Sequence, residues 1–141
     1  APFFEDVNRG AAAEGLPGLL DPDDGQGRVV LHLDDGRRSL LLAERTWDVI
    51  TMEPLLPDSP FAVHLYTHEF YAIARNALAP GGLLCQWVPP HALAPEPFDA
   101  VLAAFCQSFP WSGVFLFGTQ VVLLGADAEP ALDPEIGRAH G

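Results

Sequence analysis

The sequence has little positive charge. Its 141 residues include 7 Lys and Arg against 19 Asp and Glu, which gives a formal net charge of −12 at pH 7. Nucleic-acid phosphates demand a basic face, so this balance argues against a nucleic-acid-binding protein. An acidic field would suit a cationic substrate such as an amine or a sulfonium. Charge alone, however, favours the simpler interpretation of an acidic surface with no specific partner.

The sequence also lacks long apolar runs and a leader. It has no stretch of 18 apolar residues that could span a bilayer. No basic segment followed by an apolar stretch opens the chain, so no signal peptide is visible. The chain starts at Ala1 and has one methionine, Met52. We therefore expect a fragment of a longer protein, and a hydrophobic content of 49% is enough for one domain with a core.

Cysteine is scarce as well. Cys85 and Cys106 stand inside apolar segments and have no close spacing. This pattern predicts buried thiols in a reducing compartment rather than a disulfide or a metal site. We accordingly expect a cytoplasmic protein.

Two apolar segments with strand character are the most informative part of the chain. Residues 47–52 run into Glu53, and residues 83–88 include Gln86. A helical pattern lies between them, as in the βαβ units of an open α/β sheet. Ligands collect at the carboxyl ends of the strands in such sheets. Glu53 and Gln86 are therefore candidate site residues.

Turn residues and hydrophobic periodicity define the remaining elements. Thr67 is a plausible N-cap, and Pro80-Gly81-Gly82 is expected to end the helix that Thr67 begins. We expect a mixed, mainly parallel sheet whose faces are covered by the two longest helices. The expected elements are a helix in 1–14, a loop at 15–27, strand 28–33, helix 39–44, strand 47–52, loop 53–63, helix 67–79, strand 83–88, helix 96–109 and hairpin 114–124.

Other site classes find little support. His64, His68 and Glu69 invite a metal hypothesis, but no His-Glu-x-x-His pattern exists, and we expect no metal. Ser59 and Ser112 lie in no nucleophile-elbow context, which argues against a hydrolase.

Several motifs follow one another along residues 28–125: Asp35-Gly36-Arg37, Asp48-Val49-Ile50, Glu53-Pro54, Leu65-Tyr66-Thr67-His68-Glu69-Phe70-Tyr71, Pro80-Gly81-Gly82 and Gln86-Trp87. Together they resemble the spermidine synthase family. The resemblance is closest to a divergent bacterial branch whose members are often fused to membrane segments, so the parent protein could be membrane-tethered. It implies a Rossmann-like, methyltransferase-type sheet that binds decarboxylated S-adenosylmethionine and moves an aminopropyl group onto a polyamine.

The resemblance also implies roles for single residues. Asp35 and Gly36 match the pair that holds the adenine, and Glu53 matches the catalytic base. Without the resemblance, Asp35 would be a turn residue and Glu53 a solvated loop acid. Gln86 either touches the nucleoside or caps its strand. Asp58 and Tyr66 are weaker candidates for binding the substrate, and Tyr66 is also interpreted as a packing residue, like Tyr71.

The sequence departs from the family in two places. The glycine-rich first strand and the following strand with the ribose-binding acid are absent, because nothing before residue 28 reads as Gly-x-Gly after a strand. A second family acid, three residues after the base, is replaced by Leu56. Asp58 lies nearby, but two positions further along a proline-rich loop.

These departures set the expected extent of the domain. Residues 1–125 would form a partial domain that lacks its first two strands and ends in a β-hairpin, and 126–141 a loose acidic tail. A homodimer or a missing N-terminal segment would cover the incomplete sheet. The fragment alone is expected to be inactive. Besides an aminopropyltransferase, the alternatives are an S-adenosylmethionine-dependent methyltransferase of the same fold and a non-catalytic domain.

Overall fold

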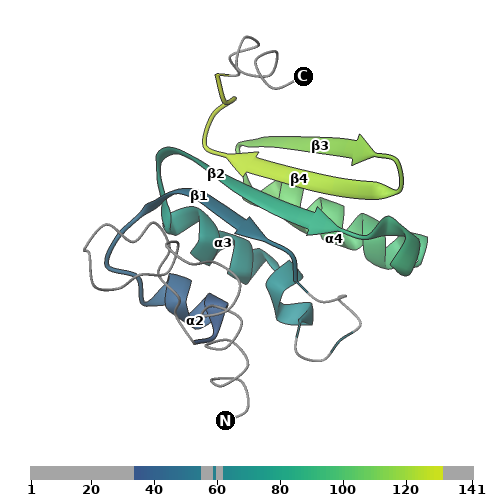
Figure 1. Ribbon diagram of the computed structural model, residues 1–141, viewed down its shortest axis with the longest axis horizontal. Coiled ribbons are helices and arrows are strands. Elements are labelled where there is room, and N and C mark those ends of the chain that lie inside the picture. Colours follow the sequence, from purple (N-terminus) through teal and green to yellow (C-terminus); the bar gives the residue numbers. More distant parts are fainter. Residues whose placement is uncertain (1–33, 55–58, 60–61, 132–141) are drawn as a thin grey trace, which may run out of the picture. The chain divides into compact units, whose positions relative to one another are not determined.

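A computed structural model describes residues 34–54, 59 and 62–131 (Figure 1). The chain divides into two units, residues 1–35 and 36–141, and the elements below belong to the second. The helix expected in 1–14, the loop at 15–27 and the strand at 28–33 lie outside the described residues.

The described strands form a mixed four-stranded sheet in the order β1-β2-β4-β3. β1 (Trp47–Met52) pairs in parallel with β2 (Leu78–Val88), which pairs antiparallel with β4 (Gln120–Ala126). β3 (Trp111–Phe117) pairs antiparallel with β4 and lies at one edge of the sheet. The predicted α/β class is confirmed. Strand 47–52 has the predicted bounds, and the edge hairpin is longer than predicted.

The longest described helices are α3 (His68–Asn76), with 9 residues, and α4 (Pro95–Ser108), with 14 residues. Thr67 is the N-cap of α3, as predicted, because its hydroxyl oxygen accepts a hydrogen bond from the backbone N–H of Phe70 at 3.3 Å. No helix in the described part of the chain has the length and hydropathy needed to cross a bilayer. The shorter helical elements are α2 (Gly36–Leu41), η1 (Val63–Tyr66) and η2 (Pro90–Ala92).

Helices α3 and α4 pack on the same face of the sheet (Figure 1), so the expectation that they cover its two faces was wrong. β3 is parallel to β2 because both are antiparallel to β4. The crossovers from β1 to β2 and from β2 to β3 therefore advance in the same direction across the sheet. Parallel crossovers are right-handed in nearly all proteins, and two that advance together place their helices on one face.

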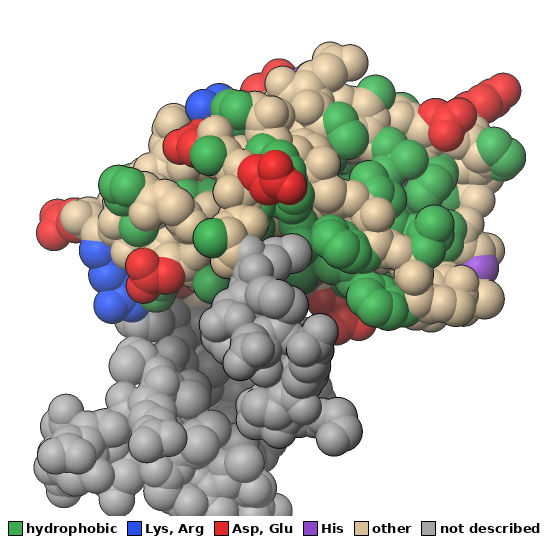
Figure 2. All heavy atoms as spheres, turned by 90° about the horizontal axis from the view of Figure 1, so that it is seen from above, with side chains coloured by type: hydrophobic (Ala, Val, Ile, Leu, Met, Phe, Trp, Pro, Cys, Tyr) green, Lys and Arg blue, Asp and Glu red, His purple; other side chains and the backbone are tan. Residues whose placement is uncertain are grey.

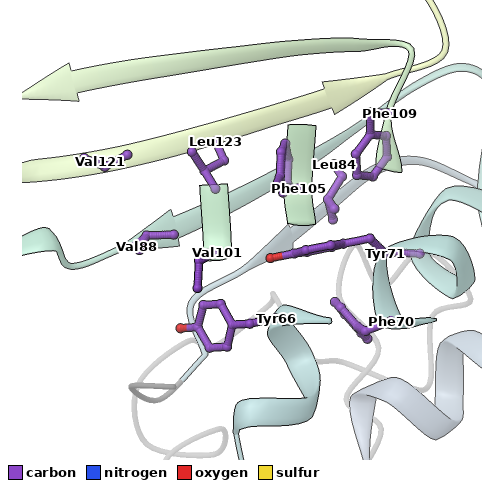
Figure 3. Packing of buried hydrophobic residues seen from close by; sticks show 11 residues of the cluster. Tyr66, Phe70, Tyr71, Leu84, Val88, Val101, Phe105, Phe109, Val121 and Leu123 are labelled. Carbon is purple, nitrogen blue, oxygen red and sulfur yellow. The ribbon is translucent and has the colours of Figure 1, made fainter. Parts of the chain in front are cut away.

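The face covered by these helices, here called the inner face, holds an aromatic core (Figure 3). Tyr71 packs edge-to-face on Phe105 with ring centroids 5.1 Å apart, and Phe105 lies 5.0 Å from Phe109. Both Tyr71 and Phe105 are fully buried. The buried cluster comprises Tyr66, Phe70, Tyr71, Ala74, Leu84, Val88, Val101, Phe105, Phe109, Val121 and Leu123.

Pro80-Gly81-Gly82 does not end helix α3, which stops at Asn76. The tripeptide lies inside β2, where the pairing register jumps from Trp47↔Leu78 to Val49↔Leu83. It forms the irregularity that this jump requires, and Gly81 has φ +80, a conformation that L side chains rarely adopt. The tripeptide is therefore a site of irregular backbone, as its composition indicates, but it interrupts strand β2 rather than ending helix α3.

The opposite, outer face of the sheet is not covered by any of the helices described here (Figure 1). Its apolar side chains include half-buried Cys85 on β2 and the exposed rings of Phe115 and Phe117 on β3. Val114 and Leu116 are exposed as well, but they lie on the inner face, because their register partners Leu123 and Val121 belong to the buried cluster. Figure 2 shows hydrophobic side chains gathered over the half of the molecule that carries the β3–β4 hairpin.

The prediction of two buried thiols was wrong, because Cys106 is exposed on α4. The apolar residues around Cys106 suggested burial, but Cys106 is not on the side of α4 that carries the buried residues Val101 and Phe105.

We predict that Thr67→Ala destabilises the protein by about 1 kcal/mol, because the first turn of α3 loses the hydroxyl that satisfies the Phe70 N–H. Urea unfolding of the chain measures the loss. Thr119→Ala, in the exposed hairpin turn, is the matched control and should change stability by less than about 0.5 kcal/mol. Equal losses in the two variants would show that the cap contributes nothing specific.

Candidate functional site

The carboxyl ends of β1 and β2 bring two predicted site residues to one edge of the sheet. Met52 is the register partner of Gln86, and Glu53 directly follows Met52. The two strands are parallel, so both residues stand at the edge where ligands bind in open α/β sheets. Glu53 is exposed, whereas Gln86 is fully buried on the inner face.

Tyr66 is tied to the segment that follows β1. Its hydroxyl donates a long hydrogen bond of 3.5 Å to the backbone carbonyl of Pro54, the residue after Glu53. Burial raises the pKa of Tyr66 to about 12, so the hydroxyl stays protonated and remains a donor at neutral pH. The ring belongs to the buried core, which agrees with its interpretation as a packing residue. Its role as a substrate contact stays a prediction.

Gln86 and Tyr71 place polar atoms inside the apolar core. Burial raises the pKa of the Tyr71 hydroxyl, and the neighbouring Gln86 amide opposes this effect in part. The hydroxyl and both amide atoms nevertheless have no partner with full hydrogen-bond geometry in the described part of the chain. The two side chains are therefore close neighbours without a formed hydrogen bond between them. No pattern in the sequence indicates that Tyr71 and Gln86 are neighbours.

Asp35 directly precedes helix α2, and Gly36 is the first residue of that helix. Asp35 is exposed, and its backbone N–H donates to the Asp34 carboxylate at 2.8 Å. Gly36 is the first residue of α2, and a Cβ built on it would meet no atom within 4 Å. The space beside Gly36 is consistent with close approach of a ligand to the backbone. The adenine-binding role of the pair stays a prediction.

Asp58 and Leu56 lie outside the described residues. The parts of the chain that the structure describes contain no group of three His, Cys, Asp or Glu side chains suited to a metal ion.

A pocket of about 250 Å³ lies between α2 and α3, but Arg45 and Thr46 in its lining immediately precede β1. It therefore opens at the amino end of the strand, away from Glu53, and is not the candidate site.

Comparison with known proteins gives short sequence matches. No family model matches the chain. A polyamine aminopropyltransferase from Nitrosomonas europaea is 42% identical over 57 residues, which is 40% of this chain and 17% of that protein. The Mycobacterium tuberculosis protein of the same name is 38% identical over 60 residues, or 40% of this chain and 12% of that protein. The matches thus span only a small part of these curated relatives.

The structural comparisons extend over nearly the whole chain. A spermidine synthase in complex with the transition-state analogue AdoDATO has a TM-score of 0.75 at 20% identity, covering 94% of this chain and 47% of that structure. Human methyltransferase-like protein 13, in complex with SAH, has a TM-score of 0.65 at 20% identity, covering 98% and 64%. At these identities the likeness establishes the fold. The chain spans about half the length of the spermidine synthase it resembles.

Together these findings confirm the resemblance to the spermidine synthase family and the methyltransferase-type α/β fold. The polyamine aminopropyltransferases are similar to this chain in sequence, and the spermidine synthase is similar to it in structure. Neither comparison adds support for the branch that is fused to membrane segments.

Proposed function

We propose that this chain carries part of the site of a spermidine synthase-like transferase. The observation that carries the proposal is the placement of Glu53 and Gln86 at the carboxyl ends of adjacent parallel strands, in a chain with segmental identity to polyamine aminopropyltransferases. The intact protein would move an aminopropyl group from decarboxylated S-adenosylmethionine to a polyamine acceptor. In this proposal Asp35 and Gly36 hold the adenine and Gln86 contacts the nucleoside.

The proposed reaction needs a carboxylate beside the acceptor nitrogen. A polyamine nitrogen is mostly protonated near neutral pH and attacks only as the free base. Glu53 attracts the ammonium group and accepts its proton. The nitrogen then forms a bond to the carbon attached to sulfur, the carbon–sulfur bond breaks, and its electron pair stays on sulfur as a neutral thioether nucleoside. The net charge of −12 favours the approach of both cationic reactants.

The second candidate is an S-adenosylmethionine-dependent methyltransferase. Leu56 in place of the second acid and the fold shared with methyltransferase-like protein 13 favour it. The deciding assay supplies the full-length protein with decarboxylated S-adenosylmethionine and putrescine, and follows aminopropylated product by mass spectrometry. Product formation supports the transferase. Binding of S-adenosylmethionine without any aminopropyl product would support the methyltransferase instead.

We predict that Asp35→Ala weakens binding of S-adenosylmethionine and of its decarboxylated form about tenfold or more, because a lost hydrogen bond to a charged group costs about 1.5–3 kcal/mol. Both ligands should be affected alike, since adenine recognition does not depend on what the sulfur carries. Isothermal titration of the full-length protein measures the two dissociation constants.

Gly36→Ala tests the neighbouring position without disturbing the protein. The added methyl group meets no described atom, so thermal stability should be unchanged while nucleoside affinity falls. Unchanged affinity in both variants would place the adenine elsewhere.

A further inference from the structure

The side chain of Gln86 is a buried polar group with no apparent structural use. It is fully buried on the inner face, and its register partners are Met52 on β1 and Leu123 on β4. Neither of these side chains can satisfy an amide. In the described part of the chain, neither the nitrogen nor the oxygen of this amide has a hydrogen-bond partner. Leaving such a group unpaired costs about 1–3 kcal/mol, so an apolar residue would stabilise the sheet better.

Tyr71 is the polar neighbour that can restrain this amide. Its ring is enclosed by Phe70, Phe105 and Phe109, with centroids 5.8, 5.1 and 6.4 Å away, so the direction of the hydroxyl is fixed. Figure 3 shows that the hydroxyl points away from α3, along the underside of β2, toward the end of the strand that carries Val88. Gln86 lies on that face of β2, two residues before Val88.

We propose that Tyr71 is a positioning residue that fixes the side-chain amide of Gln86 in one orientation at the carboxyl edge of β1 and β2. The structure does not contain a formed hydrogen bond between these two side chains, and the proposal adds one in solution: the amide nitrogen donates to the Tyr71 hydroxyl. The amide oxygen then remains as an acceptor for an N–H group of the ligand. This inference rests on the proposed function for the identity of that ligand.

The physical advantage is preorganisation. A glutamine amide can turn by half a revolution and present either its oxygen or its nitrogen, with little change in shape. The Tyr71 hydroxyl has a fixed direction because three aromatic rings surround the Tyr71 ring, so a hydrogen bond to it would hold the amide in one of its two orientations. The amide oxygen of Gln86 is fully buried and therefore has no contact with bulk water. A ligand N–H that reaches the oxygen therefore replaces an unsatisfied group rather than a solvated one, which makes the bond more favourable.

The test begins with the side-chain amide signals of Gln86 in nitrogen-15 NMR spectra, assigned by their loss in Gln86→Leu. We expect nuclear Overhauser contacts between these amide protons and the Tyr71 ring in the unmodified protein. In Tyr71→Phe the signals should shift, and their hydrogen exchange should accelerate about tenfold or more, because one hydrogen bond is lost. Tyr66→Phe is the matched control, since its hydroxyl points to the Pro54 carbonyl, and it should leave the signals in place.

A double-mutant cycle in the full-length protein tests the link to function, with S-adenosylmethionine and its decarboxylated form as probes. Tyr71→Phe and Gln86→Leu should each weaken binding of at least one probe, and the double variant should be no weaker than Gln86→Leu alone. Losses that multiply, or affinities unchanged in both single variants, would overturn the positioning role.

The NMR arm separates failure of this inference from failure of the proposed function. If the protein transfers no aminopropyl group but Tyr71→Phe releases the Gln86 amide, the pairing stands and the assigned reaction is wrong. Absent contacts between Tyr71 and the Gln86 amide in the unmodified protein would overturn the inference even if the Tyr71→Phe variant does not fold.

Discussion

Glu53→Gln should reduce aminopropyl transfer by the full-length protein by about 10²-fold or more, the usual scale for a lost acid–base group. The substitution keeps the size and hydrogen-bonding shape of the side chain but removes its ability to accept a proton. Glu53 is exposed, so the fold should be unaffected. The turnover number with decarboxylated S-adenosylmethionine and putrescine measures the effect.

Two controls make the result specific to the base. Nucleoside affinity should stay nearly unchanged in Glu53→Gln, because the carboxylate acts on the acceptor amine. Glu96→Gln, in the first turn of α4, removes an equally exposed carboxylate elsewhere and should leave turnover unchanged. Transfer at the unmodified rate in Glu53→Gln would show that this residue is not the base.

The elements that follow from local patterning could be predicted from the sequence. Apolar and polar residues do not alternate regularly over residues 47–52, so the sequence does not show which side chains face the core. The residues that favour strands in this segment, and the proline-rich segment after it, nevertheless predict the bounds of β1. The Thr67 cap and the apolar spacing on α4 were likewise readable, because N-capping and helical periodicity depend on neighbours close in sequence. The strand–helix–strand pattern also placed Glu53 and Gln86 at the carboxyl ends of two strands, and the parallel pairing of β1 and β2 confirms this position.

Features that depend on distant partners could not be predicted in the same way. Pro80-Gly81-Gly82 looks like a helix stop, and only its pairing opposite the Trp47–Val49 segment shows that it is an irregularity in β2. The shared face of α3 and α4 follows from the sheet order, which places β4 between β2 and β3. The Tyr71–Gln86 neighbourhood joins residues on different elements, so no spacing rule could reveal it.

The largest effect on stability is expected at Phe105. Phe105→Ala should cost about 3–5 kcal/mol, because the ring is fully buried between Tyr71 and Phe109 and its removal leaves a cavity that a close-packed core cannot fill. Urea unfolding at a low protein concentration measures the loss. A loss of that size is a large fraction of the stability of a small domain, so the variant could already be partly unfolded without denaturant.

Phe117→Ala is the matched control, because it removes the same side chain from β3, where 65% of it is exposed. Truncation there should change stability by less than about 0.5 kcal/mol. The two substitutions together also test the outer face of the sheet. If Phe117→Ala costs several kcal/mol, β3 is covered in solution, and the loss should then grow with protein concentration as association does. If only Phe105→Ala is costly, the inner face alone supplies the core, and the apolar outer face remains open to solvent.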